Sequence, residues 1–309
     1  MGKDKPKTIK VGRRTIEVSF PDKVLFPDAG LRKLDIVRYY ERISGLMLPL
    51  IKGRALTLRR APRGLRGESW YEQSRPDWWP NWVGGVSLPR RSGGAITHVV
   101  CRQRADIVYL ANQGCITLHA WLSQAADPER PDRLVFDFDP SDSGQFADVA
   151  FAAQRMRELL IKLGASPYLM TTGSRGLHVM VPLRPTARFA EVRELASRLC
   201  RRLADRYPDR LTVEHRKKKR RGRVFLDYLR NAYGQTAVAP YSVRLRPGAP
   251  VALPLDWAEL PSLGSAQRYN VRNIGRRLAR RSDPWAGHRR RAVALSALSR
   301  ALSALEKGD

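Results

Sequence analysis

Acidic residues are scarce in this chain of 309 residues, which carries 29 Asp and Glu against 57 Lys and Arg. The formal net charge is therefore +28, far more than solubility requires, and such an excess favours a polyanionic partner. Long apolar runs are missing as well, since no stretch reaches the roughly 18 apolar residues of a bilayer span, and the start MGKDKPKTIK lacks the apolar core of a signal peptide. Nucleic acid is therefore a better candidate partner than membrane lipid.

Cysteine is nearly absent. The three residues Cys101, Cys115 and Cys200 form no C-x-x-C pair and no Cys/His cluster at the spacing of a zinc site. We therefore predict a reduced, cytoplasmic protein without structural zinc, in which the cysteines serve as small apolar core residues.

Internal repeats and long flexible linkers are not evident either. A length of 309 residues fits two lobes or one large mixed domain. We treat residues 8–300 as one module whose lobe boundary the sequence does not define. A flexible segment is expected at residues 1–7, and a helix end or tail at residues 301–309.

Several segments have the apolar spacing of amphipathic helices. Apolar residues recur at intervals of three and four between Leu31 and Met47, and the same spacing predicts helices from Phe146 to Leu163 and from Phe189 to Tyr207. The C-terminal run ALSALSRALSALEK predicts a further helix, whose alanine and leucine face suits packing.

Short runs rich in β-branched and aromatic residues stand between these helices and predict strands. They are ITHVVC, RLVFDFDP, PYLMTTG, LHVMVPL, LTVEH, RVFLDYL and TAVAPYSVRL. Because the strands occur in pairs between single helices, their order favours an α+β fold of mixed or antiparallel sheets flanked by helices over a regular parallel wind.

The run VFDFDP places two acids in what otherwise looks like a buried strand. Successive side chains of a strand point to opposite faces, so Asp137 and Asp139 share one face while Phe136 and Phe138 share the other. Carboxylates about 6 to 7 Å apart along a strand repel each other unless cations lie between them, and hard divalent ions prefer oxygen ligands. The pattern fits a metal site, or a sheet-edge pair bonded to Arg or to a helix N-terminus.

A third acid, Asp227, ends the apolar run RVFLD and follows the basic run RKKKRRGR of Arg216 to Arg223. An ion pair with these cations is one interpretation. Three strand-borne carboxylates in a cationic protein are also what two-metal phosphoryl transfer requires, because paired ions can hold a triphosphate and activate an attacking hydroxyl. The basic surface would then bind the nucleic acid.

A turn rich in hydrogen-bond donors, TTGSRGLH at residues 171–178, connects two of the predicted strands. Glycine allows close approach of the backbone, whose N–H groups could bind phosphate. Further donors come from the side chains of Thr172, Ser174, Arg175 and His178. The alternative is an ordinary hairpin turn, in which Gly and Ser are common.

Two further polar residues stand in apolar runs. His119, in ITLHAWL, is by itself more typical of a core histidine than of a functional one. Arg244, in PYSVRLRP, could bind phosphate or a surface acid. The residues alone leave both roles open.

Taken together and in this order, VFDFDP, TTGSRGLHVMVPL and VFLDYLRNAYGQTAVAPYSVR closely resemble the polymerase domain of bacterial DNA ligase D, a member of the archaeo-eukaryotic primase superfamily. The resemblance extends from PDKVLFPDAGLRKLDIVRYYERI through LPLIKGRALTLRR to PLDWAEL, which is nearly the whole chain. It implies a primase-like fold of two interlocked lobes. It also implies a DNA-dependent nucleotidyltransferase that adds nucleotides at gaps and broken ends during non-homologous end joining.

The resemblance assigns roles to individual residues. It implies that metal is bound by Asp137, Asp139 and Asp227. It implies that the incoming nucleotide is bound by Lys52, His119, Thr172, Ser174, Arg175, His178 and Arg244, with His119 near the sugar. It implies that Trp70 and Tyr71 form an aromatic platform for the templating base and that Lys23 and Lys33 bind a 5′-phosphate across a gap.

Cofactors and partners are implied in the same way. The resemblance implies Mn²⁺ or Mg²⁺, NTP or dNTP with a preference for ribonucleotides, and DNA with gaps or double-strand ends. A Ku-type end-binding protein and a DNA ligase are further expected partners, because the sequence carries no ligase lysine motif or nuclease module. The place of action would be the bacterial nucleoid.

Three positions depart from the family pattern. Thr172 stands where Ser is frequent, which keeps the hydroxyl. Tyr233 stands where Arg or a small residue is common. Phe20 occupies a position that is often Asn in the 5′-phosphate pocket, and its ring cannot supply the amide of Asn.

Other functions use some of the same residues. A metal-dependent nuclease would use the acids but needs no triphosphate loop, and a non-catalytic nucleic-acid-binding protein needs no group of three acids. A stand-alone primase would use all of them. These functions remain as alternatives.

Overall fold

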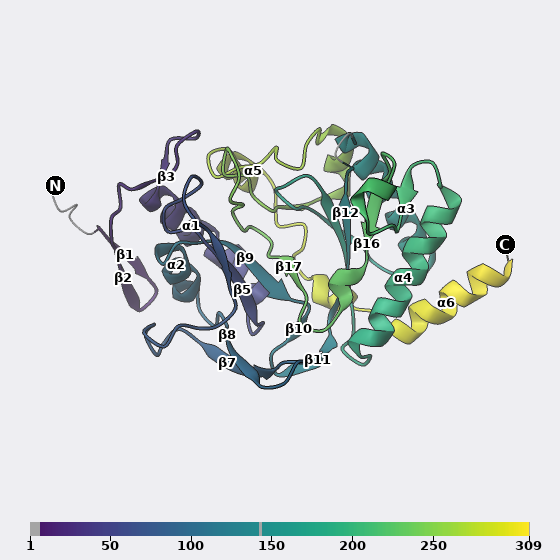
Figure 1. Ribbon diagram of the computed structural model, residues 1–309, viewed down its shortest axis with the longest axis horizontal. Coiled ribbons are helices and arrows are strands. Elements are labelled where there is room, and N and C mark those ends of the chain that lie inside the picture. The colour runs from purple at the N-terminus through teal and green to yellow at the C-terminus, as the bar shows by residue number, and fades with distance from the viewer. Residues whose placement is uncertain (1–6, 142–143, 309) are drawn as a thin grey trace. The chain divides into compact units, whose positions relative to one another are not determined.

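The computed structural model describes residues 7–141 and 144–308, and Figure 1 shows its helices and strands. The chain forms two compact units. Unit 1 contains the residues up to Trp121 together with Val238–Ala252 and Tyr269–Arg280, and unit 2 contains Leu122–Ala237, Leu253–Arg268 and the residues from Arg281 onward. Each unit combines helices with sheets, so the predicted α+β class is confirmed.

Unit 1 is built on a largely antiparallel sheet. Its elements are β1 (Lys7–Val11), β2 (Arg14–Val18), β3 (Val24–Phe26), β4 (Leu31–Arg32), α1 (Lys33–Ile51), β5 (Leu56–Arg60), β6 (Trp70–Glu72), β7 (Gly85–Pro89), β8 (Ala95–Val99), α2 (Arg104–Asn112), β9 (Cys115–Trp121) and α5 (Ile274–Arg280). Strand β17 (Thr236–Val238) leads the chain back into this unit. The sheet runs β9-β5-β8-β7, and β6 pairs with β5.

Helix α1 joins several parts of unit 1. Its buried Tyr40 hydroxyl donates to the carbonyl of Ile116 in β9 at 2.6 Å and accepts the backbone N–H of Val243 at 3.0 Å. Tyr39 donates to the carbonyl of Tyr241 at 2.7 Å. These bonds tie the segment that returns at Val238 to the helix and to the sheet.

Unit 2 contains the sheet that carries the acids. Its elements are β10 (Ser123–Gln124), β11 (Asp127–Pro131), β12 (Arg133–Asp139), α3 (Phe146–Lys162), β13 (Tyr168–Thr171), β14 (Leu177–Pro182), α4 (Phe189–Arg206), β15 (Leu211–Thr212), η1 (Lys217–Lys219), β16 (Val224–Asp227), η2 (Leu229–Asn231), β18 (Pro254–Leu255), η3 (Trp257–Ser262), η4 (His288–Arg291) and α6 (Leu295–Gly308). The sheet runs β15-β16-β12-β14-β13-β18, with β15 parallel to β16 and the other pairs antiparallel.

Helices α3 and α4 contact the central strands β12 and β16. Phe136 and Phe138 are fully buried and lie on the face of β12 opposite to Asp137 and Asp139. The apolar face of the sheet is therefore covered by helices, which leaves the acids on the other face.

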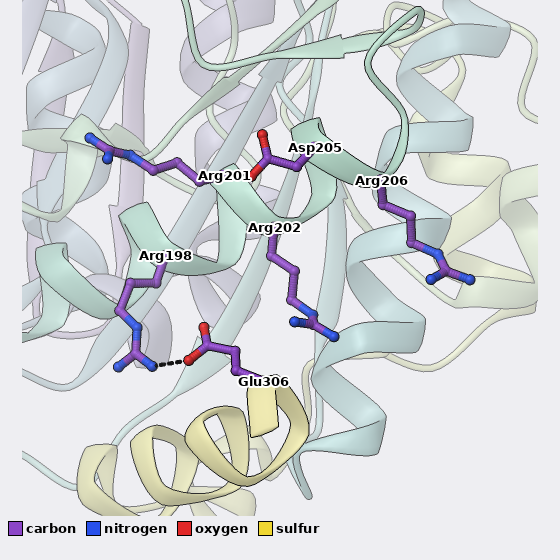
Figure 2. A pocket seen from close by; sticks show the side chains of 6 residues that line it. All are labelled: Arg198, Arg201, Arg202, Asp205, Arg206 and Glu306. Atoms are coloured by element: carbon purple, nitrogen blue, oxygen red, sulfur yellow. Dashed lines mark hydrogen bonds and ion pairs between the residues drawn. The ribbon is translucent and has the colours of Figure 1, made fainter. Parts of the chain in front are cut away.

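The outward face of α4 is cationic and holds the C-terminal helix (Figure 2). Arg198, Arg202 and Arg206 leave α4 on the same side, and Arg198 binds Glu306 of α6 at 2.6 Å and Ser303 at 3.2 Å. A cavity of about 470 Å³ lies here and is lined by Arg198, Arg201, Arg202, Asp205, Arg206 and Glu306. Part of the excess positive charge is thus concentrated on this face of α4.

The predicted helices are present with small shifts at their ends. Helix α1 begins at Lys33 rather than Leu31, because Leu31 and Arg32 form β4 and the Asp35 carboxylate accepts the N–H of Arg32 at 2.8 Å. Helices α3, α4 and α6 cover the other three predicted segments.

The secondary structure differs from the prediction in several places. Helix α5 and several strands of unit 1, among them β1, β2, β5 and β7, were not predicted, and the run LTVEH is a strand only at Leu211–Thr212. Helix α2 was not predicted, because its residues are buried on all sides and show no alternation of polar and apolar faces. The run TAVAPYSVRL was predicted as a strand, but only Thr236–Val238 is one. Pro240 offers no N–H, and Tyr241 has a φ of 68°, so the ladder cannot continue.

The three cysteines are free and buried, as predicted for core residues. Within residues 7–141 and 144–308, no helix is both long and apolar enough to cross a bilayer. The flexible segment expected at residues 1–7 lies outside the described residues except for Lys7, which begins β1.

Asn231 supports the strand that carries the acids. Its fully buried amide accepts the N–H of Val135 at 2.9 Å and donates to the carbonyl of Val135 at 2.7 Å. It also donates to the carbonyl of Tyr228 at 2.9 Å. The side chain therefore takes the place of a strand neighbour beside β12, where β16 no longer pairs with it.

We expect Asn231→Ala to lower the free energy of unfolding by about 2 to 4 kcal/mol, because it leaves a buried N–H and a buried carbonyl without partners. Asn112→Ala is the control, since Asn112 is also buried and donates to the carbonyl of Glu17 at 2.9 Å. Its expected loss is about 1 kcal/mol. Urea denaturation measures both, and equal losses would contradict the proposed support of β12.

Candidate active site

Three carboxylates lie on one face of the sheet in unit 2. Asp137 stands directly opposite Asp227 in the pairing of β12 with β16, and Asp139 lies two residues further along β12. Asp137 and Asp227 are 7% and 8% exposed, so water screens them little. The structure therefore brings together the three acids that the sequence proposed.

Two cationic or hydrogen-bonding side chains contact these acids. Arg230 lies three residues after Asp227, and its Nε is 3.5 Å from Oδ2 of Asp137 and 3.6 Å from Oδ2 of Asp227. His178, opposite Asp137 on β14, places Nε2 3.4 Å from Oδ1 of Asp137. Arg230 was not predicted, although its spacing of three from a strand-ending acid is a signal that could have identified it.

The acids perturb one another. Burial, and then the charge of Asp137, raise the pKa of Asp139 from 3.8 to about 6. Burial and the charge of Asp137 also raise the pKa of Asp227, although the Leu229 N–H that binds its carboxylate acts in the opposite direction. Burial alone would lower the pKa of Arg230, but the neighbouring carboxylates hold it above its usual value.

The donor chemistry suits a hard divalent cation. The carboxylates supply only oxygen ligands, they repel one another, and a guanidinium already lies between two of them. Within the described part of the chain, no three His, Cys, Asp or Glu side chains are gathered closely enough to hold one ion. A divalent ion bound by Asp137 and Asp227 would therefore compete with Arg230 for the same oxygen atoms.

The hairpin loop between β13 and β14 lies beside the acids. Gly176 is required there, because a Cβ at this position would collide with the carbonyl oxygen of Phe138 and would lie 3.4 Å from Oδ1 of Asp139. The Thr172 hydroxyl donates to the Gly176 carbonyl at 3.0 Å and accepts the N–H groups of Ser174 and Gly176. Thr172 therefore shapes the loop through its hydroxyl.

Several of the predicted residues lie in unit 1. His119, on β9, has its ring 5.7 Å from that of Tyr71, and the guanidinium of Arg59 lies 5.9 Å from the Tyr71 ring. Trp70 precedes Tyr71 in β6 and pairs with Arg60, so its ring points to the opposite face of the strand. Of the two platform residues, Tyr71 is thus the one beside His119.

Lys23 and Lys33 are brought together by the β3–β4 hairpin. The N–H of Lys33 donates to the carbonyl of Lys23 at 2.8 Å, and Nζ of Lys33 donates to the carbonyl and hydroxyl of Ser19 at 2.7 and 3.1 Å. Burial, and then the charge of Lys23, lower the pKa of Lys33 to about 8. Lys33 is also the first residue of α1, where the helix dipole favours an anion.

The remaining predicted residues of unit 1 take varied positions. Phe20 is 66% exposed and has a φ of 49°, a left-handed conformation that Asn tolerates better than Phe. Lys52 is exposed at the C-terminal end of α1. Arg244 donates its backbone N–H to the carbonyl of Pro250 at 2.7 Å.

The raised pKa of Asp139 has a consequence for stability. The folded state binds this proton more tightly than the unfolded chain does, so stability falls as the pH rises from about 4 to about 6, and the full penalty applies above that range. We expect Asp139→Asn, in EDTA at about pH 7.5, to raise the free energy of unfolding by about 1 to 3 kcal/mol. Below about pH 4 the difference should be small.

Thermal unfolding at the two pH values measures this effect. Asp127→Asn is the control, because Asp127 is partly exposed and its carboxylate pairs with Arg130 at 3.3 Å. If the gain in stability of Asp139→Asn does not change with pH, charge repulsion at Asp139 is not the cause of that gain.

The sequence of this chain is similar to those of LigD proteins over most of its length. The family model "LigD, primase-polymerase domain" matches residues 32–285. The multifunctional non-homologous end joining protein LigD of Pseudomonas aeruginosa is 33% identical over 276 residues, which are 88% of this chain and 33% of that protein. The bifunctional non-homologous end joining protein LigD of Bacillus subtilis is 29% identical over 265 residues, which are 85% of this chain and 42% of that protein.

A solved structure, the polymerase domain of Mycobacterium tuberculosis ligase D in complex with DNA, matches with a TM-score of 0.83 and 30% sequence identity. The match covers 90% of this chain and 99% of that domain. The chain thus has the fold of that domain and spans between a third and a half of the length of these two LigD proteins. It belongs to the LigD primase-polymerase domain family and is a nucleotidyltransferase of the primase-polymerase type.

Proposed function

We propose that this chain adds nucleotides, with ribonucleotides preferred, to DNA ends and gaps by metal-assisted phosphoryl transfer. The observation that carries the proposal is the position of Asp137, Asp139 and Asp227 on one sheet face, directly beside the glycine loop of residues 172–176. A nuclease needs the acids without such a loop, and a binding protein needs neither. The combination therefore favours a polymerase.

Different residues of unit 2 would bind the metal, bind the triphosphate and orient Asp137. The three carboxylates would hold Mn²⁺ or Mg²⁺, which when bound would neutralise charge at the transferring phosphoryl group and lower the pKa of the attacking hydroxyl. Arg175 is exposed at the tip of the loop and, with Ser174 and the backbone N–H groups, would bind the triphosphate. His178 would orient Asp137 through its contact of 3.4 Å.

The residues of unit 1 would select the nucleotide and the DNA. We assign the sugar 2′-hydroxyl to His119, whose ring nitrogens can donate or accept a hydrogen bond. The resemblance supports Lys52 and Arg244 as further nucleotide contacts and Tyr71 as a stacking partner of the templating base. These assignments account for the proposed preference for ribonucleotides.

The biological setting is proposed from the relatives. The names of the Pseudomonas and Bacillus proteins describe non-homologous end joining, and the matched mycobacterial domain was solved with DNA. We propose that this chain acts in end joining on DNA in the bacterial nucleoid, together with a Ku-type end-binding protein and a DNA ligase.

We expect Asp137→Ala and Asp227→Ala to abolish primer extension and to leave DNA binding intact or slightly stronger. Each change removes a metal-binding carboxylate, and each also removes a negative charge that repels DNA. The measurement is gel extension of a gapped substrate with ATP or dATP in Mn²⁺, beside a binding assay in the same buffer. Asp127→Ala serves as the control, because Asp127 pairs with Arg130 in β11 instead of joining the acid group.

The outcomes separate the alternative functions. Extension that persists in either variant would refute the metal assignment. Shortening of the DNA by the unmodified chain would indicate a nuclease, and binding without extension would indicate a non-catalytic binder. Equal kcat/KM for ATP and dATP, or an unchanged ratio in His119→Ala, would refute the proposed selection of ribonucleotides.

We further expect a gapped DNA with a downstream 5′-phosphate to bind about tenfold more tightly than its hydroxyl form, because a charge-assisted contact has roughly that effect. Lys23→Ala and Lys33→Ala should each reduce this ratio. Since Lys33 has a pKa of about 8, the ratio should also fall as the pH rises above that value, where its ammonium group is lost.

Affinities at one salt concentration give the ratio for each variant. Lys10→Ala is the control, since Lys10 is an exposed lysine of β1 outside the hairpin. If the unmodified chain binds the phosphate and hydroxyl forms equally well, the 5′-phosphate pocket has been lost in this chain, where Phe20 stands in place of Asn. A ratio that falls equally in Lys10→Ala would indicate a diffuse basic surface instead.

A further inference from the structure

Trp78, on the surface of unit 1, has no role in the proposed polymerase function. Trp78 is 64% exposed, and Trp70 on the same side is 39% exposed. The guanidinium of Arg60 lies 5.3 Å from the Trp70 ring and 6.0 Å from the Trp78 ring. We call these three side chains the tryptophan face.

The tryptophan face is held in place by its neighbours. Arg60 pairs with Glu72 at 3.3 Å, and the Trp70 indole N–H donates to the same carboxylate at 3.4 Å. Trp78 meets the buried Trp79 edge to face, with ring centroids 6.0 Å apart. The rings are therefore positioned before any ligand arrives.

Folding alone does not account for this arrangement. An indole ring that stays 64% exposed gains only part of the free energy that burial would give, and exposed aromatic groups often mark binding surfaces. Arg60 lies over the Trp70 and Trp78 rings and Trp79 meets Trp78 edge to face, which leaves about two thirds of Trp78 exposed. The Trp78 ring is thus available to stack on a planar partner.

The charges around the face identify the partner. Arg63 and Arg66 are exposed in the loop that joins β5 to β6, next to Arg59 and Arg60 at the end of β5. Between Arg59 and Trp78 the chain carries five arginines against the three acids Glu68, Glu72 and Asp77, so the segment that bears the rings is cationic on balance. Exposed rings in such a segment suit an anionic chain with exposed planar groups, which describes single-stranded nucleic acid. Bases in a duplex are already stacked on their neighbours and offer no free face.

We propose that Trp78, with Trp70 and Arg60, binds unpaired nucleotides of the DNA by base stacking. Trp70 directly precedes Tyr71 in β6, but its ring points to the opposite face of the strand, so this surface is distinct from the residue assigned above to the templating base. The bound nucleotides are accordingly unpaired ones outside the templating position. Their position rests on the proposed function, whereas the binding of single strands does not.

The test uses the whole chain without nucleotide and with EDTA, so that binding is measured apart from catalysis. A single strand of about ten deoxythymidines and a blunt duplex of equal length are titrated, with anisotropy and tryptophan fluorescence as readouts. We expect Trp78→Ala to weaken single-strand binding roughly tenfold and to leave duplex binding within about twofold. Trp78→Phe should restore most of the affinity, because it keeps a stacking ring.

Ile161→Ala is the matched control, since Ile161 is another large exposed apolar residue, 52% exposed, but belongs to α3 of unit 2. It should change neither affinity. Single-strand binding by Trp78→Ala within about twofold of the unmodified chain would overturn the proposal, and so would an equal loss on both DNAs. An unfolded Trp78→Ala is recognised by circular dichroism, and Trp78→Phe and Trp78→Leu then decide, with retained affinity expected only for Phe.

The result is independent of the proposed function. If single-strand binding does not depend on Trp78 while Asp137→Ala still abolishes extension, only the stacking proposal fails. If the unmodified chain extends no primer but loses single-strand affinity in Trp78→Ala, the tryptophan face stands and the polymerase assignment fails.

Discussion

Repulsion between buried carboxylates is the constraint on which the arrangement of unit 2 depends. Asp137 and Asp227 face each other across two paired strands, where little water is present to separate their charges. Arg230 lies between them because η2 follows β16 directly, and Asn231, the next residue, fixes η2 to the backbone of β12. One short segment thus supplies an acid, its counter-charge and the bond that holds both in place.

The sequence predicted those parts of the site that depend on local geometry. Asp137 and Asp139 share a face because strand side chains alternate, and this needed no knowledge of the fold. The register that sets Asp137 opposite Asp227 joins residues ninety positions apart, and nothing local defines it. The spacing of Arg230 three residues after Asp227 is a local signal for its contact with that acid, but its contact with Asp137 depends on the same register.

The glycine loop and the aromatic residues show a second limit of prediction from the sequence. The glycines of TTGSRG predicted a close approach, but only the fold shows that Gly176 approaches the carbonyl of Phe138 beside Asp139. The resemblance joined Trp70 and Tyr71 in one platform, whereas strand alternation separates their rings. Helix α2 escaped prediction because burial on all sides removes the amphipathic signal on which such predictions rely.

Because acids are scarce in this chain, the three clustered carboxylates of Asp137, Asp139 and Asp227 stand out against its positive charge. In a chain of charge +28, phosphate groups are attracted almost anywhere on the surface, so attraction alone cannot define a reaction centre. The carboxylates of Asp137, Asp139 and Asp227 gather negative charge at one place, and such oxygen ligands suit a divalent cation better than a bare phosphate. Burial and the charge of Asp137 raise the pKa of Asp139 to about 6, so protons begin to neutralise this group in mild acid, where it would hold a cation less tightly.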